Sequence, residues 1–226
     1  MKKCFSVLLT LFVVLSLFYV SCRGDKKEGV LSKTKDYEYV DLGLSVKWAT
    51  CNVGATNPWE CGDYYAWGEV KVKDNYDWST YKWFNGTHNA MTKYCKNSRK
   101  GRIDNKQVLD YSDDVARVKW GGRWRMPTEV EQEELRENCK WDWCTLNGVY
   151  GCKVTSNING NSIFLPAAGI RIGAETYIKG SDGRYWSSSL YGSACEAYCL
   201  IFENYYGSDW LECGRCSGLT VRPVCE

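Results

Sequence analysis

The sequence predicts a single α+β domain, with helices in its first part and short strands in its second. Both helical patterns lie before residue 139, and from Trp141 to the end no long helical period occurs. Helices and strands that are segregated along the chain in this way are typical of α+β domains. Residues 37–226, about 190 in number, are enough for one well-buried core, so one domain is predicted over this range.

The elements of the first half are short. Residues 39–50 alternate apolar and polar side chains roughly every second position, which predicts one or two short strands. Residues 62–69 are predicted as a short aromatic strand or a turn, and residues 71–106 as an irregular polar and aromatic stretch. A short helix with an acidic first turn is predicted over residues 112–120.

The clearest helix is predicted over residues 126–138. Thr128 can cap its first turn, and Glu131 follows three residues later, which is the spacing of a capping box. Apolar positions on this helix are few, so only a narrow buried stripe is expected, made of Val130, Leu135 and Cys139. The rest of the chain is predicted as turns and short strands, with strands over residues 151–155, 162–166, 185–189, 197–203 and 219–224.

The N-terminus is predicted to direct and anchor the chain. A short basic start, an almost unbroken apolar run and a Ser-Cys pair have the layout of a secretory signal. The Ser-Cys end resembles a bacterial lipoprotein signal, so residues 1–21 are assigned to a signal peptide and Cys22 to the lipid anchor. Residues 22–36 are rich in Lys, Gly, Asp and Ser, which indicates a flexible tether. Plain secretion and a retained anchor helix are the alternatives.

The composition favours recognition over nucleic-acid binding. The formal net charge is +2, so no electrostatic attraction to nucleic acid is expected. The eleven tryptophans and sixteen tyrosines are more than a core of this size needs. Tyr and Trp on a surface are suited to binding, because they give a large contact area at low cost in side-chain entropy.

Thirteen cysteines are present, of which Cys4 lies in the signal and Cys22 is the predicted anchor. The remaining eleven are an odd number, so at least one thiol is expected to be free or to form an intermolecular bond. Disulfides are expected outside the cytosol, and spacing alone leaves their pairing open.

Six segments, in this order, resemble those of one known family. They are YVDLGLSVKWATCNVGA (39–55), GDYYAWGE (62–69), WGGRWRMPT (120–128), SIFLPAAG (162–169), GRYWSSSLYGS (183–193) and GLTVRPV (218–224). Together they are similar to the Fibrobacter succinogenes major paralogous domain, and the resemblance covers roughly residues 37–226. It implies a C-type-lectin-like fold, with two helices and small irregular antiparallel sheets whose last strands hold the Trp186-Ser-Ser and Val221-Arg-Pro elements.

The family occurs in lipoproteins and surface proteins and has no established biochemical activity. The resemblance therefore implies a lipid-anchored protein of the cell envelope, placed in the outer membrane on either of its faces. Between Trp186-Ser-Ser and Val221-Arg-Pro the family has a fixed skeleton with variable positions between. Alternation along the strand at 197–203 points Leu200 and Phe202 to one face and the intervening side chains to the other.

The variable positions are expected on the surface, where they would form a ligand-binding face. These positions are Tyr191, Cys195, Cys199, Ile201, Glu203, Tyr205, Tyr206, Asp209, Leu211, Glu212, Cys213 and Cys216. Similar segments in C-type-lectin-like proteins are targets of diversity-generating retroelements, which fill variable positions with Tyr, Ser, Cys, Asp and Gly. Diversification of this segment is therefore a hypothesis.

The C-x-x-C of Cys213 and Cys216 is interpreted as two independent occupants of variable surface positions. One alternative is a disulfide among Cys195, Cys199, Cys213 and Cys216. A metal or redox site made by the same thiols is the other, because four thiolates can bind zinc tetrahedrally.

The sequence contains no catalytic constellation, so we predict that the protein is not an enzyme and needs no cofactor or metal. His88 is the single histidine and lies in a loop without a nucleophile or oxyanion motif beside it. Asp113 and Asp114 are better explained as a helix cap than as a catalytic pair. The motifs of calcium-dependent sugar-binding lectins are missing from the sequence. A formylglycine-generating-type oxidase is the enzyme alternative, because that class shares the lectin-like fold and uses a cysteine pair, which Cys195 and Cys199 or Cys213 and Cys216 could imitate.

These observations predict a lipid-anchored envelope protein that binds an unidentified protein or glycan through its C-terminal face, in adhesion or recognition. The lipid is its only predicted contact with a membrane, and nucleic acid is excluded as a partner. The alternative is a structural or assembly subunit of the cell surface, whose partner would be another envelope protein.

Overall fold

The computed structural model describes residues 32–34, 37–204 and 207–226. The predicted signal peptide, the anchor Cys22 and most of the tether lie outside this part of the chain. For residues 32–34 and 207–211 the backbone alone is described.

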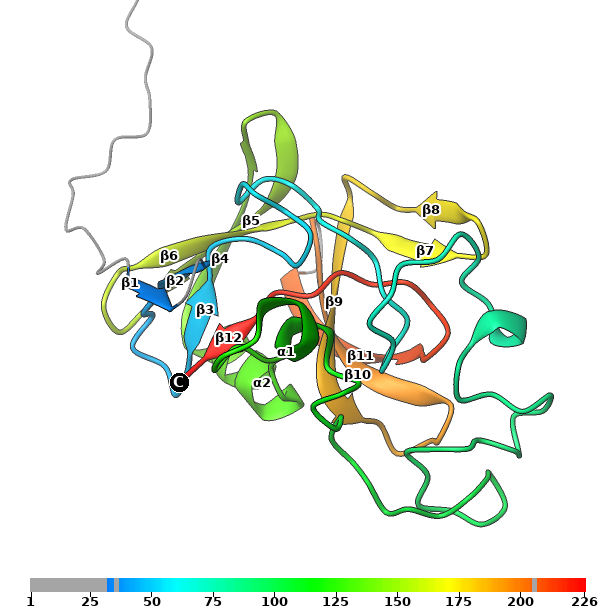
Figure 1. The fold of residues 1–226 in the computed structure, drawn as a ribbon. Coiled ribbons are helices and arrows are strands. Elements are labelled where there is room, and N and C mark those ends of the chain that lie inside the picture. Colours follow the sequence, from blue (N-terminus) through cyan, green and yellow to red (C-terminus); the bar gives the residue numbers. More distant parts are fainter. Residues whose placement is uncertain (1–31, 35–36, 205–206) are drawn as a thin grey trace, which may run out of the picture.

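Four antiparallel sheets and two α-helices make up the described fold, which confirms the α+β class (Figure 1). One sheet has the strand order β1-β2-β3-β12, so the last strand pairs with one of the first. The orders of the others are β11-β10-β9, β4-β5-β6 and β7-β8. The strands are β1 (Ser32–Thr34), β2 (Tyr37–Val40), β3 (Lys47–Ala49), β4 (Cys139–Leu146), β5 (Val149–Ser156), β6 (Ser162–Pro166), β7 (Ile170–Ile172), β8 (Glu175–Tyr177), β9 (Asp182–Leu190), β10 (Glu196–Glu203), β11 (Gly207–Gly214) and β12 (Val224–Cys225). The helices are the 3-10 helix η1 (Trp78–Thr80) and the α-helices α1 (Val115–Trp120) and α2 (Glu129–Glu137).

Both predicted α-helices form, and side chains cap both, but α1 begins at Val115, so its first turn is not acidic, contrary to the prediction. The Asp114 carboxylate accepts a hydrogen bond from the backbone N–H of Arg117 at the start of α1. At the start of α2 the predicted capping box is confirmed: the Thr128 hydroxyl accepts from the N–H of Glu131, and the Glu131 carboxylate accepts from the N–H of Thr128. The interpretation of the acidic pair as a helix cap is therefore confirmed for Asp114, while Asp113 is buried beside two lysines.

The buried stripe of α2 differs from the prediction at one position. Leu135 is buried as predicted, but Val130 is 66% exposed. Gln132 is buried instead, and its side-chain amide donates to the backbone carbonyl oxygens of Tyr185 and Trp186 at 3.1 and 3.2 Å. A polar side chain is stable at this position because it satisfies backbone acceptors of β9 that are shielded from water.

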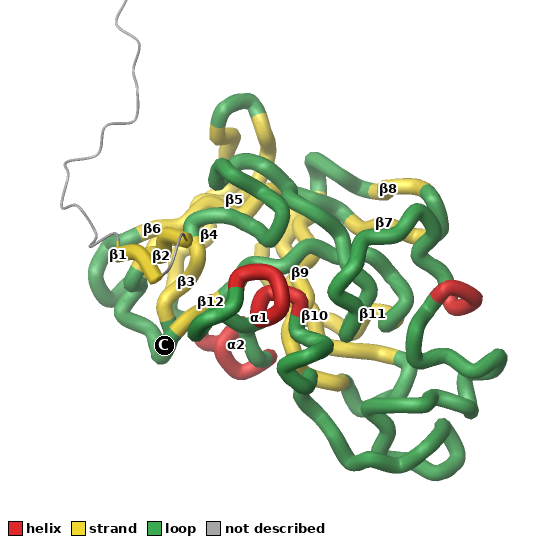
Figure 2. Tube along the Cα trace, in the orientation of Figure 1, coloured by secondary structure: helices red, strands yellow, loops and turns green. Residues whose placement is uncertain are grey.

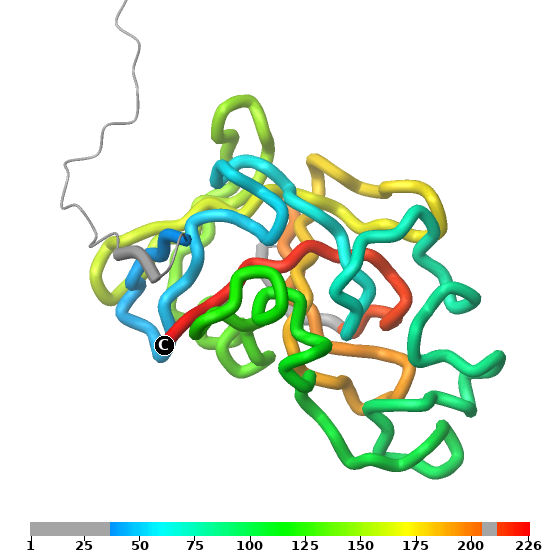
Figure 3. The backbone as a smooth tube through the Cα atoms, in the orientation of Figure 1, coloured from blue at the N-terminus to red at the C-terminus, as the bar shows by residue number. Residues whose placement is uncertain are grey.

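The hairpin of β4 and β5 is longer than the single strand predicted over residues 151–155. Leu146 pairs with Val149, so Asn147 and Gly148 alone form the turn. Both have positive φ, 49° and 80°, which is the requirement of a type I′ turn and suits Asn-Gly. The hairpin extends away from the body of the fold (Figure 3).

The other predicted strands of the second half form, with one exception. β6 coincides with its predicted range, and Trp186-Ser-Ser lies within β9 as the resemblance implies. Residues 219–224 are not a continuous strand, because Leu219 and Thr220 make isolated bridges to two different elements and Val221-Arg-Pro223 lies between these bridges and β12. The last strands therefore do not hold the Val-Arg-Pro element.

The side chain of Arg222 explains the irregular backbone around it. It is buried, and its Nε donates to Asn52 Oδ1 at 2.8 Å. Its Nη1 donates to the carbonyl oxygens of Ala49 and Thr50, both at 3.1 Å, and its Nη2 to that of Phe164 at 2.9 Å. The guanidinium of Arg222 therefore links β6 to the end of β3 and the residues that follow it. β3 and β6 belong to two different sheets.

Residues 71–106 are irregular as predicted, with η1 as their single helical turn in the described chain (Figure 2). A second buried arginine, Arg215, holds this segment from the C-terminal side. Its Nε donates to the Tyr81 hydroxyl at 2.8 Å, its Nη1 to the carbonyl of Ala194 at 2.6 Å and its Nη2 to that of Lys93 at 3.1 Å. A segment without strands is therefore fixed by donors that come from elsewhere in the chain.

Candidate functional site

Four residues of the predicted ligand-binding face lie in the core. Cys199, Ile201, Cys213 and Cys216 are 0%, 4%, 6% and 7% exposed, so their prediction as surface positions is wrong. The period-two alternation of β10 does hold, but β10 is the middle strand of its sheet, and alternate residues pack into two different hydrophobic clusters. A strand that is covered on both faces has no outward side on which variable residues could be displayed.

Four further positions of the predicted face have described side chains that are not buried. Tyr191 and Cys195 precede β10, whereas Glu203 ends it, so roughly 20 Å of strand separates the two groups. Glu212 is exposed on β11. No side chain is described for the last four positions, Tyr205, Tyr206, Asp209 and Leu211. The described members of the predicted set therefore do not form one continuous face, and one of them, Glu203, lines a cavity.

The cavity beside Glu203 has a volume of about 530 Å³. Three parts of the fold build it: the β4–β5 hairpin, the turn that leads from β8 into β9, and the end of β10. The residues that line it are Trp143, Tyr150, Ile178, Gly180, Ser181, Asp182, Arg184, Glu203 and Asn204. These segments are distant in sequence, so the cavity exists only in the folded chain. We refer to it as the hairpin pocket.

One wall of the hairpin pocket is aromatic. Trp143 and Tyr150 lie on neighbouring strands in diagonal positions, since Trp143 pairs with Cys152 and Thr145 with Tyr150. Their ring centroids are 6.4 Å apart and their planes differ by 16°. Tyr150 is 53% exposed, so a ligand can reach its ring without any rearrangement of the core.

Another part of the hairpin pocket is lined by charged side chains. Asp182 and Arg184 share one face of β9 and form an ion pair of 3.1 Å, with Arg184 Nε also donating to the Asp182 carboxylate. Glu203 is the partner of Asp182 across the β9–β10 ladder. Two carboxylates and one guanidinium are thus held on the same two strand ends.

Burial and pairing set the protonation of this cluster. Burial raises the pKa of Asp182 above its ordinary value, and the hydrogen bond and charge of Arg184 oppose this rise. Burial alone would lower the pKa of Arg184, but the hydrogen bond and charge of Asp182 raise it. The pKa of Asp182 is raised overall, and Arg184 stays charged beside it, so the cluster offers charged and hydrogen-bonding groups to a polar ligand.

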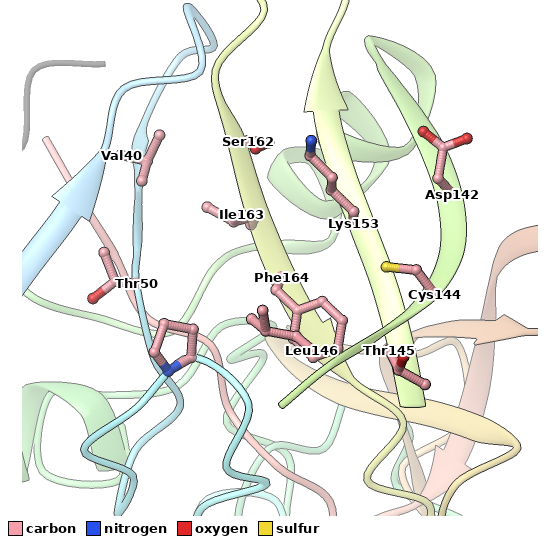
Figure 4. Close-up of a pocket in the computed structure, with 11 residues that line it drawn as sticks. Val40, Thr50, Asp142, Cys144, Thr145, Leu146, Lys153, Ser162, Ile163 and Phe164 are labelled. Atoms are coloured by element: carbon pink, nitrogen blue, oxygen red, sulfur yellow. The ribbon is translucent and has the colours of Figure 1, made fainter. Parts of the chain in front are cut away.

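A second cavity, of about 470 Å³, lies on the other face of the β4–β5–β6 sheet (Figure 4). Val40 and Thr50 lie on one side of it, and Asp142 and Cys144 of β4 lie on the other. The remaining lining residues are Pro58, Thr145, Leu146, Lys153, Ser162, Ile163 and Phe164. Its charged lining residues are Asp142 and Lys153, which face each other across the β4–β5 ladder. Because this cavity contains none of the predicted site residues, the hairpin pocket is the better candidate site.

The sulfur that approaches Cys213 belongs to Cys199 and not to Cys216. The two Sγ atoms of Cys199 and Cys213 are 3.0 Å apart, whereas Cys216 packs in a separate cluster with Tyr76 and Tyr81. Cys195 contacts the carbonyl oxygen of His88 at 3.5 Å. Neither cysteine pair suggested for an oxidase is therefore a pair in space. Among the described residues, no group of three His, Cys, Asp or Glu side chains is placed to hold a metal ion.

Sequence reasoning missed Trp143, Tyr150, Asp182 and Arg184. A local signal existed for the first two, because Asn147-Gly148 between alternating residues predicts a hairpin that pairs Trp143 with the strand of Tyr150. No local signal marks Asp182 and Arg184, since their role depends on the hairpin that packs beside them.

In the described part of the chain, no helix is both long and apolar enough to span a membrane. No family model, no curated protein and no solved structure matches the chain.

Proposed function

We propose that the protein recognises a glycan in the hairpin pocket, as an adhesion or recognition protein of the cell envelope. One observation supports this most directly: an exposed aromatic wall and a cluster of charged side chains share a single cavity. Aromatic rings pack on the apolar C–H face of a sugar ring, and carboxylate and guanidinium groups bind neighbouring hydroxyls in pairs.

The size of the cavity favours a glycan over a folded protein as the ligand. About 530 Å³ lies within the range of small-molecule pockets, and it can hold one or two sugar rings. A protein ligand is recognised on a flatter and larger surface, which buries about 800 Å² on each partner. A loop or terminus of a protein would fit the pocket, so a protein ligand is a possible outcome of the binding test.

The proposal places this pocket in a C-type-lectin-like domain of the Fibrobacter succinogenes major paralogous domain family, tethered by lipid at Cys22. The two helices and the small antiparallel sheets are compatible with that fold. The motif residues Trp186 and Arg222 are buried and hydrogen-bonded, which is the role expected of a family skeleton. The Ser21-Cys22 end of the apolar run supports the lipid anchor.

Diversification by a retroelement stays a hypothesis, and the burial of β10 narrows where it could act. A substitution at Cys199, Ile201, Cys213 or Cys216 would change the core and is expected to destabilise the domain. Glu203 and Glu212 can vary at little cost, because neither is buried.

The test is a glycan-array screen of residues 23–226, followed by calorimetry with the best-bound glycan. Tyr150→Ala removes a stacking surface and Glu203→Gln removes a charged acceptor, and each is expected to weaken binding about tenfold, which corresponds to about 1.4 kcal/mol. Tyr111→Ala is the matched control, because Tyr111 is 71% exposed and lies outside the pocket.

Binding that is equal in all three variants would place the site elsewhere, with the cavity of Figure 4 as the next candidate. A wild-type protein that binds no glycan but pulls down an envelope protein would favour the structural-subunit alternative.

A further inference from the structure

We propose that Cys199 and Cys213 form a disulfide that joins β10 to the edge strand β11. Their Sγ atoms are 3.0 Å apart, closer than two sulfur atoms in ordinary non-bonded contact. A disulfide requires an S–S distance of about 2.05 Å, so a movement of about 1 Å closes the bond. Rotation of the two side chains, with a small adjustment of the adjoining strands, is enough for such a shift.

The strand register supports the same pair. Cys199 faces Leu211 across the β10–β11 ladder and Cys213 faces Ala197, so the two cysteines are diagonal neighbours on adjacent strands. Side chains in this arrangement lie on the same face of a sheet and within reach of one another. Cys216, two residues beyond the end of β11, and Cys195, one residue before β10, lie outside this ladder.

The surroundings of the two thiols divide the chemical roles between them. Cys199 donates its S–H to Cys213, and this hydrogen bond together with Arg184, whose Nη1 lies 4.0 Å from Cys213 Sγ, lowers the pKa of Cys213. Burial raises the pKa of Cys199. Cys213 is therefore the nucleophile and Cys199 the thiol that reacts second.

The oxidant in this reaction is a dithiol carrier in its disulfide form. The Cys213 thiolate attacks one carrier sulfur, forms a mixed disulfide and releases the other carrier sulfur as a thiolate. Cys199 then loses its proton and attacks the Cys213 sulfur, which releases the second carrier thiol. Two protein thiols are oxidised and one carrier disulfide is reduced, so electrons and protons balance.

Burial decides when this exchange can take place. Cys199 and Cys213 are closed to a carrier in the folded domain, but β11 pairs with β10 alone and is an edge of its sheet in the described fold. Oxidation therefore occurs before β11 docks or while it is transiently open. In cells, oxidising dithiol carriers are found outside the cytosol. Oxidation in vivo therefore depends on the export that we propose, but the choice of Cys199 and Cys213 as the pair does not.

The disulfide would join two cysteines that are 14 positions apart, and the segment that it closes contains Glu203. A cross-link over a loop of this length raises the melting temperature by about 6 to 12 °C in a domain of this size. It would also fix the strand end that carries one wall of the hairpin pocket.

Peptide mapping of the full-length protein tests the pairing. Membranes are alkylated before reduction, solubilised in detergent and digested with trypsin and a glutamate-specific protease, which release residues 197–203 and 213–215 as separate peptides with one cysteine each. We expect these peptides linked, at the sum of their masses less two hydrogen atoms. Alkylation of both cysteines before reduction, or a link from either to another cysteine, would overturn the proposal.

A second experiment separates pairing from export. Full-length protein purified from the cytosol is unfolded, reduced and refolded with oxidised glutathione, and the link between 197–203 and 213–215 should form there as well. Reductant should lower its melting temperature by about 6 to 12 °C more than it does in Cys199→Ala/Cys213→Ala, with Cys216→Ser as the control that keeps the full drop. An unlinked refolded protein refutes the pairing, while a link in vitro but not in cells refutes export alone.

Discussion

Replacement of Arg222 by methionine is expected to remove much of the stability of the domain. Methionine has a similar length and keeps the apolar packing of the side chain, but it has no donor. Three buried acceptors then lose their partner, the Asn52 side-chain oxygen and the carbonyl oxygens of Ala49 and Phe164, and so does the partly buried carbonyl oxygen of Thr50. These acceptors belong to segments on either side of the core, so no other donor can serve them all.

The magnitude follows from the number of acceptors. Each buried acceptor without a donor costs about 1 to 3 kcal/mol, so the three buried ones cost about 3 to 9 kcal/mol, and the partly buried Thr50 carbonyl adds less. One term acts in the opposite direction, because the folded protein no longer buries the Arg222 cation. Burial lowers the pKa of Arg222, which shows that the cation is less well solvated there than in water. We therefore expect a net loss of about 4 kcal/mol, out of the 5 to 15 kcal/mol that is typical of a whole domain.

Urea unfolding of residues 23–226, followed by tryptophan fluorescence, measures this loss. Arg136→Met is the matched control, because Arg136 lies in the last turn of α2 and forms partly exposed ion pairs with Glu133 and Glu137, so its removal should cost less than about 1 kcal/mol. If Arg222→Met loses less than the control, the guanidinium does not join the two sheets and our account of the Val-Arg-Pro element is wrong.

Two further predictions concern the helices and their surroundings. Thr128→Ala should lower the unfolding free energy by about 1 kcal/mol through loss of the cap, whereas Thr128→Ser should keep it; equal losses in urea unfolding would refute the role of the hydroxyl. Burial alone would raise the pKa of Asp113, but hydrogen bonds from Lys93, Tyr94 and Lys82 outweigh it and lower the pKa. Since the pKa of Asp113 is lower in the folded than in the unfolded protein, its contribution is complete above about pH 4 and is lost as the pH falls through the folded value. Asp113→Asn should therefore cost about 2 to 4 kcal/mol at pH 7 and much less at low pH, and a loss that does not depend on pH would contradict this.

Local patterns predicted those elements whose stability depends on local contacts. The capping box of Thr128 and Glu131 needs three residues of spacing and no partner from elsewhere, and it is present as predicted. The strand over 162–166 and the two short strands within 37–49 are likewise bounded by their own sequence. The prediction of a strand over residues 219–224 was wrong because the conformation of this segment depends on the acceptors of the Arg222 side chain. Those acceptors lie more than 50 residues away in the sequence.

The error at β10 has a different origin. Alternation correctly divides its residues between two faces, but alternation does not reveal whether the second face meets water or another layer. The residue types of Cys199 and Ile201 do not distinguish a buried position from an exposed one. The hydrophobic cluster that covers them includes residues from the N-terminal half of the chain. The resemblance to a family with a variable C-terminal segment predicted that these positions lie on the surface, and the packing of β10 shows that Cys199 and Ile201 do not.

Burial of β10 on both faces limits where a ligand site can lie on this half of the molecule. The side chains from Cys199 to Phe202 are buried, so on β10 only residues outside this stretch can contact a ligand. The end at Glu203 gains a cavity because the β4–β5 hairpin stands beside it and supplies Trp143 and Tyr150. Ligand choice therefore depends on two segments that lie more than 50 residues apart, and variation in the C-terminal segment alone would change the polar wall while the aromatic wall stayed the same. Such a site would therefore distinguish sugars that differ in their hydroxyl groups rather than in their number of rings. An array of related sugars of this kind is the ligand set that tests it.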